Sequence, residues 1–189
     1  MKRLDALRVI YPELEGSIVV TIMGAVAAEL YSLGHRPNFF YLEHAMGLAS
    51  SMGLGLALSK PTKRVVVLDG DGSLLMNLGT LSTLAWHAPP NMIHVVFDNQ
   101  SLLSVGGFPT ATSAGADLAG IARSSGFEYA VTVNNEEDLR TEWHTVWDRN
   151  KLGMIVARVD AIGPASFRMD LSLLENRFQF QRWLQQQES

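Results

Sequence analysis

Short apolar runs alternate along the chain with stretches in which apolar residues recur at helical spacing. The runs are rich in β-branched residues, and a run that is apolar on both faces is typical of a buried parallel strand. We predict strands over residues 18–22, 39–42, 65–68, 93–97, 129–133 and 154–159. This alternation predicts an α/β fold in which residues 1–189 form a single doubly wound domain. Its mostly parallel, six-stranded sheet would be flanked by helices.

Two of the predicted helices have features of their own. The helix expected from Met46 onward is dense in small residues, including glycines. A glycine inside a helix costs about 1 kcal/mol relative to alanine, so we expect close packing there against a neighbouring backbone or a ligand. Asn134 and Glu137 have the spacing of a capping pair and predict the start of another helix. Its apolar face would hold Leu139, Trp143, Val146 and Trp147.

Acidic and amide residues follow two of the predicted strands. Residues 69–73 read Asp-Gly-Asp-Gly-Ser after one strand, and Asp98-Asn99 follow the next. In an open parallel sheet, ligands bind beyond the carboxyl ends of the strands. Mg²⁺ prefers carboxylate, carbonyl and phosphate oxygens, and a helix starting near Ser73 would direct its N–H groups at a diphosphate. The pattern predicts a metal-bridged diphosphate site, although Gly-Asp-Gly alone also fits a simple tight turn.

Composition narrows the class of protein. The chain is 47% hydrophobic and 18% charged, as expected where another subunit covers part of the surface. A net charge of −4 argues against nucleic acid as a partner, and the absence of cysteine excludes disulfides. The N-terminal residues lack the apolar core of a signal peptide, and the longest apolar stretch, residues 45–58, is too short to span a bilayer. We therefore expect a cytoplasmic protein with no membrane partner.

The spacing of the two polar strand ends resembles a known motif. Gly70-Asp71-Gly72, a gap of 25 residues and then Asp98-Asn99 are similar to the magnesium and thiamine diphosphate motif of thiamine diphosphate-dependent enzymes. Residues 46–53, 117–127 and 175–178 also resemble the small β subunit of sulfopyruvate decarboxylases and the C-terminal half of phosphonopyruvate decarboxylases. The resemblance implies the thiamine diphosphate-binding fold.

The resemblance also implies a set of site residues. Magnesium would be bound by Asp71, Asn99 and the backbone carbonyl of Ser101. The implied cofactor-binding residues are Gly24, Ala25, His44, Ala45, Met46, Gly70, Asp71, Gly72, Ser73, Asn99, Ser101 and Leu103. In the family, an apolar side chain at the position of Met46 supports the bent cofactor, and the carbonyl at the position of His44 accepts a hydrogen bond from its 4′-amino group.

The chain departs from these relatives at two places. They resemble Gly-Ser-Met-Gly where this chain has residues 44–47, so His44 adds a titratable ring, and Glu43 is equally unexpected. His44 is therefore a candidate catalytic residue. After Asn99, Val105 and Phe108 stand where the relatives have Thr and Gln, which predicts a less polar 2-oxo acid as substrate. Residues 100–116 form a long loop, which we expect to be mobile without cofactor and ordered with it.

The implied activity is non-oxidative decarboxylation of a small 2-oxo acid to an aldehyde, with the cofactor's thiazolium as the electron sink. Enzymes of this family need a second domain that supplies a glutamate to the cofactor. No glutamate of this chain lies in a matching motif, so we expect a pyrimidine-binding α subunit of similar size, in a homo- or hetero-oligomer with the cofactor at the interface. A carboligating enzyme, or a subunit that binds the cofactor without turnover, would share these residues.

A phosphatase remains as an alternative from another class. Residues 65–73 also fit the nucleophile strand of haloacid dehalogenase-type enzymes, in which Asp69 would attack phosphorus and Asp71 would serve as acid and base. That family also needs a later lysine and an acidic pair, and here only Lys151 and the pair at 136–137, in a predicted helix start, follow. The five histidines show no metal-ligand spacing, and His94, within a predicted strand, is interpreted as structural.

Overall fold

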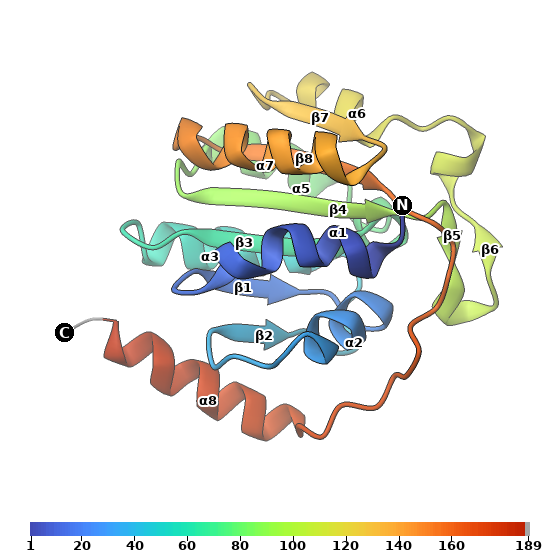
Figure 1. The fold of residues 1–189 in the computed structure, drawn as a ribbon. Coiled ribbons are helices and arrows are strands. Elements are labelled where there is room, and N and C mark those ends of the chain that lie inside the picture. The colour runs from blue at the N-terminus through green and yellow to red at the C-terminus, as the bar shows by residue number, and fades with distance from the viewer. Residues whose placement is uncertain (188–189) are drawn as a thin grey trace.

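Six parallel strands form the central sheet, in the order β2-β1-β3-β4-β8-β7 (Figure 1). The structure is a computed structural model and describes residues 1–187. Its strands are β1 (Ile18–Thr21), β2 (Phe39–Tyr41), β3 (Val65–Gly70), β4 (Met92–Asp98), β7 (Ala130–Val133) and β8 (Gly153–Arg158). Each lies within two residues of a predicted strand, so the predicted sheet is confirmed. The central strands β1, β3 and β4 are buried almost throughout, as their uninterrupted apolar sequences require.

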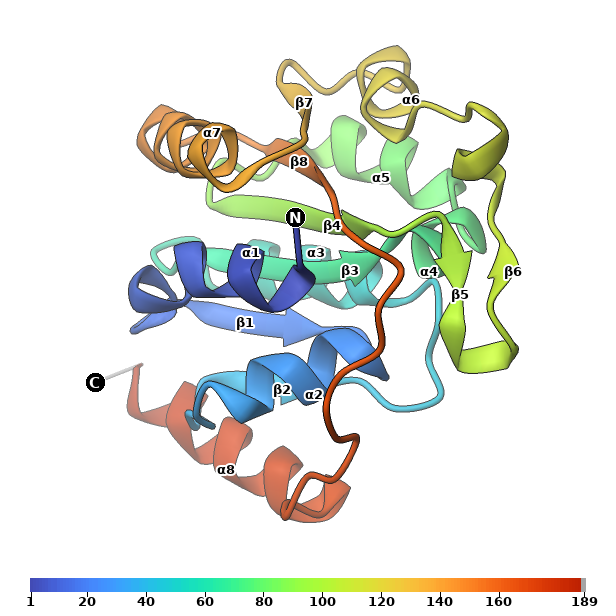
Figure 2. The same ribbon diagram turned by 45° about the vertical axis from the view of Figure 1, so that its right-hand side comes forward.

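Helices cover both faces of the sheet (Figures 1 and 2). One face packs against α1 (Arg3–Ile10), α2 (Ala25–Ser32) and α7 (Glu136–Arg149), and the short helix η1 (Tyr11–Leu14) follows α1. The other face packs against α3 (Ala49–Ser59), α5 (Gly79–His87) and α6 (Leu118–Ser124). The chain is thus doubly wound, as predicted.

The last helix, α8 (Leu173–Gln186), closes the β2 edge of the sheet. Asn176 is buried there; its Nδ2 donates to the carbonyl of Phe39 (2.7 Å) and its Oδ1 accepts from the N–H of Tyr41 (3.0 Å). These bonds satisfy backbone groups that an edge strand otherwise leaves open. The segment between β8 and α8 passes the start of α1, where the carbonyl of Ile162 accepts from Arg3 Nη2 (3.1 Å).

Three local predictions need correction. The glycine-containing helix begins at Ala49 rather than Met46, because Gly47 has φ +81° and stands in a left-handed turn. Within that helix, Gly53 does pack closely, but against a side chain rather than a backbone or a ligand: a Cβ there would lie 2.2 Å from Val67 Cγ2 on β3. The cap of α7 is Asn135, not Asn134: its Oδ1 accepts from the N–H of Asp138 (2.9 Å).

The third correction concerns the turn after β3. The helix expected near Ser73 begins at Asp71 as the short α4 (Asp71–Leu75), with Gly70 as its N-cap. Residues 100–116, here called the hairpin segment, contain more regular secondary structure than a plain loop. They contain an antiparallel pair, β5 (Ser101–Leu102) and β6 (Phe108–Pro109), and the short helices η2 (Leu103–Val105) and η3 (Ala111–Ala114). The hairpin segment projects beyond the carboxyl ends of β3 and β4 (Figure 2).

Candidate functional site

A cavity opens at the carboxyl ends of β1, β3 and β4. Its lining comes from the turn after β1, the turn after β3, the loop before α3 and the hairpin segment. The lining residues are Arg3, residues 22–26, Met46, residues 70–73, Phe97, Asn99 and residues 101–104. The cavity therefore lies where the doubly wound topology predicts a ligand.

Most of the predicted site residues meet at this cavity. Those in its lining are Gly24, Ala25, Met46, Gly70, Asp71, Gly72, Ser73, Asn99, Ser101 and Leu103. His44 and Ala45 are not among the lining residues, and His44 is exposed with φ +52°. Glu43 borders a different hollow, between β2 and α8. The catalytic role predicted for His44 therefore has no support from the cavity's shape.

Glycines shape the cavity in two ways. A Cβ built on Gly24 or Gly70 meets no atom within 4 Å, so both residues leave open space in the cavity lining. Gly24 also has φ +78°, which an L side chain rarely adopts. At Gly72, a Cβ would lie 2.2 Å from Leu102 Cδ2, so a larger residue would force the Leu102 side chain of the hairpin segment to shift. These positions form a cradle in which a ligand can approach the backbone closely.

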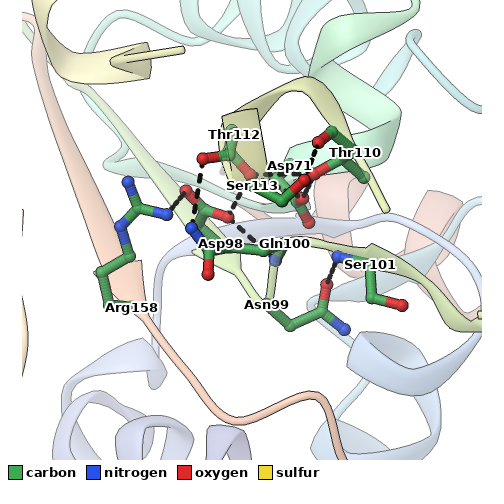
Figure 3. Close-up of polar contacts among 9 residues, drawn as sticks. All are labelled: Asp71, Asp98, Asn99, Gln100, Ser101, Thr110, Thr112, Ser113 and Arg158. Carbon is green, nitrogen blue, oxygen red and sulfur yellow. Dashed lines mark hydrogen bonds and ion pairs between the residues drawn. The ribbon is translucent and has the colours of Figure 1, made fainter. Parts of the chain in front are cut away.

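Asp71 is the acidic side chain of the lining, and it is only 2% exposed. Thr110 Oγ1 donates to its Oδ2 at 2.6 Å, and Thr112 Oγ1 lies 3.3 Å from the same oxygen (Figure 3). Burial raises the pKa of the Asp71 carboxyl above its usual range; the Thr110 hydrogen bond opposes this rise, and the nearby charge of Asp98 adds to it. The site thus holds a desolvated carboxylate, which a bound cation would compensate.

Asn99 lies at the end of the neighbouring strand. The register pairs Gly70 with Phe97, so the ends of β3 and β4 bring Asp71 and Asn99 to the same cavity. Asn99 Oδ1 accepts from the N–H of Ser101 (3.1 Å), which turns the chain out of β4 (Figure 3). Carboxylate, amide and backbone oxygens form a donor set that suits Mg²⁺, which usually takes one or two carboxylates and completes its shell with phosphate and water. Among residues 1–187, no cluster of three acidic or histidine side chains offers another metal site.

Asp69 and His94 lie beneath the site and are fully buried. Asp69 Oδ1 accepts from the N–H of Gly70 (2.9 Å), and its Oδ2 lies 3.4 Å from His94 Nε2. The structural interpretation of His94 is supported. Asp69 does not line the cavity and has no access to a substrate, which argues against the phosphatase alternative.

Several residues of the site were not singled out from the sequence. Arg3 is only 4% exposed and reaches the cavity from α1; its Nε donates to Glu29 Oε2 (2.8 Å). Thr110 and Thr112 contact Asp71, and Asp98 pairs with Arg158 (2.8 Å between Oδ2 and Nη1). No local pattern marks Arg3 or the threonines, because their partners are distant in sequence.

Fold and site together define a diphosphate-binding α/β domain of the type found in cofactor-dependent enzymes. Residues 20–157 match the family model "Thiamine pyrophosphate enzyme, C-terminal TPP binding domain". The chain belongs to this family, and thiamine diphosphate is its cofactor. No helix within residues 1–187 has the length and apolar character needed to cross a membrane.

Individual relatives agree with this assignment. The chain is 39% identical over 158 residues to the sulfopyruvate decarboxylase subunit beta of Methanocaldococcus jannaschii, which covers 83% of each chain. It is 43% identical over 140 residues to the phosphonopyruvate decarboxylase of Streptomyces hygroscopicus, covering 74% of this chain and 34% of that protein. Among solved structures, the benzoylformate decarboxylase from Polynucleobacter necessarius superposes with a TM-score of 0.71 at 19% identity, over 87% of this chain and 34% of that one. This chain thus spans about a third of the solved structure and of the phosphonopyruvate enzyme.

Proposed function

We propose that this chain is the thiamine diphosphate- and Mg²⁺-binding subunit of a 2-oxo acid decarboxylase that releases an aldehyde. The observation that carries the proposal is the meeting of Asp71 and Asn99 at one cavity, next to glycines that leave it open. The names of the relatives, sulfopyruvate decarboxylase subunit beta and phosphonopyruvate decarboxylase, support the decarboxylase class. A cytoplasmic location is part of the proposal.

The residues of the chain would act mainly by binding and orientation. Asp71, Asn99 and the carbonyl of Ser101 would hold Mg²⁺ against the diphosphate, and Gly24 and Gly70 would let the backbone approach it. When bound, the cofactor supplies a thiazolium that accepts the electron pair left by departing carbon dioxide. Met46, a partly buried side chain in the lining, offers an apolar support for the cofactor.

A partner subunit is part of the proposal. In the described residues, the cavity lining contains Asp71 but no glutamate. Glu29 is held by Arg3 and Glu43 borders another hollow, so neither serves as the activating glutamate that the family requires. The designation "subunit beta" in the relatives supports a second subunit, and we infer that this partner is a pyrimidine-binding α subunit of similar size. The cofactor would lie between the two, in a homo- or hetero-oligomer.

The hairpin segment bears on the substrate. Val105 and Phe108 are 55% and 67% exposed; they follow the cavity-lining residues 101–104 in sequence but do not line the cavity themselves. They give the hairpin segment apolar surface where a sulfonate or phosphonate would require hydrogen-bond donors. We infer a small 2-oxo acid less polar than sulfopyruvate. Carboligation would use the same residues of this chain, and analysis of products from 2-oxo acid with and without an added aldehyde separates the two reactions.

Calorimetric titration with thiamine diphosphate, with and without Mg²⁺, tests the cofactor site. We expect Mg²⁺-dependent binding, weak in the isolated chain, and no turnover of a panel of small 2-oxo acids until a partner is added. Asp69→Asn is the matched control for Asp71→Ala, because Asp69 lies outside the cavity. Phosphate release that depends on Asp69 would contradict the cofactor site, and decarboxylation by the isolated chain would contradict the partner.

A further inference from the structure

Asp71 belongs to a continuous polar network that ends at Arg158 (Figure 3). Thr110 Oγ1 donates to Asp71 Oδ2 (2.6 Å) and lies 2.8 Å from Thr112 Oγ1. Thr112 Oγ1 donates to Asp98 Oδ1 (2.8 Å), and Asp98 Oδ2 forms the ion pair with Arg158. The network thus connects four separate parts of the chain: the turn after β3, the end of β4, the hairpin segment and the end of β8.

The two threonine hydroxyl groups have enough protons to give one hydrogen bond to each of the two carboxylates. Each threonine hydroxyl has one proton to donate. If Thr110 donates to Asp71 and Thr112 to Asp98, each carboxylate accepts one hydroxyl hydrogen bond. Asp98 is further compensated by Arg158, whereas no cationic side chain within residues 1–187 pairs with Asp71. A cation in the cavity would therefore be needed at Asp71 and not at Asp98.

The two threonines are the buried members of an otherwise exposed stretch. Thr110 and Thr112 are 7% and 1% exposed, while Pro109, Ala111 and Ser113 are exposed. Backbone bonds fix this stretch: the N–H of Thr110 donates to the carbonyl of Gln100 (3.1 Å), and Gln100 Nε2 donates to the carbonyl of Thr112 (3.1 Å). The hydroxyl groups therefore contact the carboxylates from a fixed position. Burying two hydroxyl groups against two carboxylates contributes little apolar packing. A role in holding those carboxylates therefore explains the buried threonines better than a role in the hydrophobic core.

We propose that Thr110 and Thr112 are positioning residues for the cation, acting through Asp71. Thr110 donates to Oδ2 of Asp71, and Thr112, which donates to Asp98, lies 3.3 Å from the same Oδ2, so the other oxygen of Asp71, Oδ1, is the one that binds the cation. This inference rests on the proposed function, since it requires Mg²⁺ at Asp71. Carboxylates that bind metals are commonly oriented by such outer hydrogen bonds, and loss of these bonds typically lowers metal affinity about 10–100-fold. Because the threonines belong to the hairpin segment, cation binding and docking of that segment would also strengthen each other.

The test compares Thr110→Val and Thr112→Val with Thr110→Ser and Thr112→Ser in the full chain. The readout is the Mg²⁺ concentration that gives half-maximal thiamine diphosphate binding, measured by calorimetry, with circular dichroism to verify folding. We expect the valine variants to need about 10–100-fold more Mg²⁺. The serine variants keep the hydroxyl, so we expect them to stay within about threefold of the wild type.

A second readout follows the hairpin segment itself. In the wild type, Mg²⁺ with thiamine diphosphate should slow proteolytic cleavage within residues 100–116, and this protection should be lost in the valine variants at the same Mg²⁺ concentration. A purely structural role would lower thermal stability equally with and without Mg²⁺ and leave the Mg²⁺ midpoint unchanged, which would overturn the inference. If the wild type itself showed no Mg²⁺-dependent binding, the proposed function would fail together with this inference. If the wild type bound but the valine variants kept its Mg²⁺ midpoint, only the inference would fail, so the two failures are distinguishable.

Discussion

Two asparagines bracket β4, and their surroundings differ sharply. Asn91, at the amino end, is 6% exposed, and its Nδ2 donates to the carbonyls of Ala57, Lys60 and Lys63 at 3.1, 3.0 and 2.8 Å. Asn99, at the carboxyl end, lines the cavity; its Oδ1 accepts one bond, and its Nδ2 has no partner in residues 1–187. The same residue type is thus saturated by protein at one end and open to a ligand at the other.

The difference reflects the two ends of a parallel sheet. At the amino ends, side-chain amides satisfy the carbonyls of loops that connect helices to strands; Asn38, before β2, likewise donates to the carbonyls of Leu14 and Ser17. Such amides stabilise the fold because a buried carbonyl without a partner is costly. At the carboxyl ends the chain leaves polar groups facing a cavity, where a ligand satisfies them. The number of protein partners therefore separates structural from functional amides here.

Asp71→Ala is the strongest way to test the carboxyl end. We expect Mg²⁺-dependent binding of thiamine diphosphate to fall at least about 100-fold, because the only carboxylate that residues 1–187 contribute to the cavity lining is removed. The fold should survive, since loss of the side chain also removes a buried charge. Calorimetry measures the affinity and urea unfolding measures stability. Retained Mg²⁺-dependent affinity would show that Asp71 does not bind the metal.

Asn91→Ala tests the amino end. Three carbonyls would lose their shared donor, and we expect the free energy of unfolding to fall by about 2–3 kcal/mol. Urea titration measures this change. Cofactor affinity per folded molecule should stay within about twofold of the wild type. A larger loss of affinity with normal stability would mean that the two ends are not separate in function.

The strands were predictable because a fully buried parallel strand must be apolar on both faces, as in residues 65–68 and 93–97. The positions of Asp71 and Asn99 were predictable because strand ends of one sheet meet at one edge. The starts of helices were less predictable. Asn134 and Asn135 are neighbours and either could cap α7, so only the backbone conformation decides between them. The contacts of Thr110 with Asp71 and of Arg3 with Glu29 join segments 39 and 26 residues apart, and no local pattern encodes such pairs.

Asn99→Ala is the matched counterpart of Asn91→Ala. We expect the Mg²⁺ concentration for half-maximal cofactor binding to rise about 10-fold, because one neutral oxygen ligand is lost and water can replace it in part. The free energy of unfolding should change by less than about 1 kcal/mol, since the side chain of Asn99 makes a single hydrogen bond within residues 1–187. Calorimetry at several Mg²⁺ concentrations and urea titration give both values. Loss of stability without loss of Mg²⁺ affinity would mean that Asn99 is a structural residue, which contradicts the functional role assigned to the carboxyl end of β4.

The smallest effect concerns the stability of the chain without metal. Burial raises the pKa of Asp71 in the folded state above its value in the unfolded chain, which is about 3.9. At pH values between these two pKa values, the native state therefore binds more protons than the unfolded state. The stabilising contribution of protonated Asp71 is therefore present below about pH 3.9 and is lost as the pH rises through the folded pKa. Asp71→Asn keeps the shape and removes the charge, so at neutral pH and without Mg²⁺ the variant should be more stable than the wild type, by on the order of 1 kcal/mol.

This difference should shrink as the pH falls through the folded pKa of Asp71, and also when Mg²⁺ and thiamine diphosphate are added, because both the proton and the cation compensate the carboxylate. Urea unfolding of the two proteins at several pH values, with and without the ligands, provides the comparison. Asn91→Asp offers a control at the other end of β4, since a charge placed among carbonyls there should destabilise the chain at neutral pH with or without Mg²⁺. If Asp71→Asn were less stable than the wild type at neutral pH without Mg²⁺, the carboxylate would be contributing to the fold, and the contrast between the two ends of the sheet would not hold.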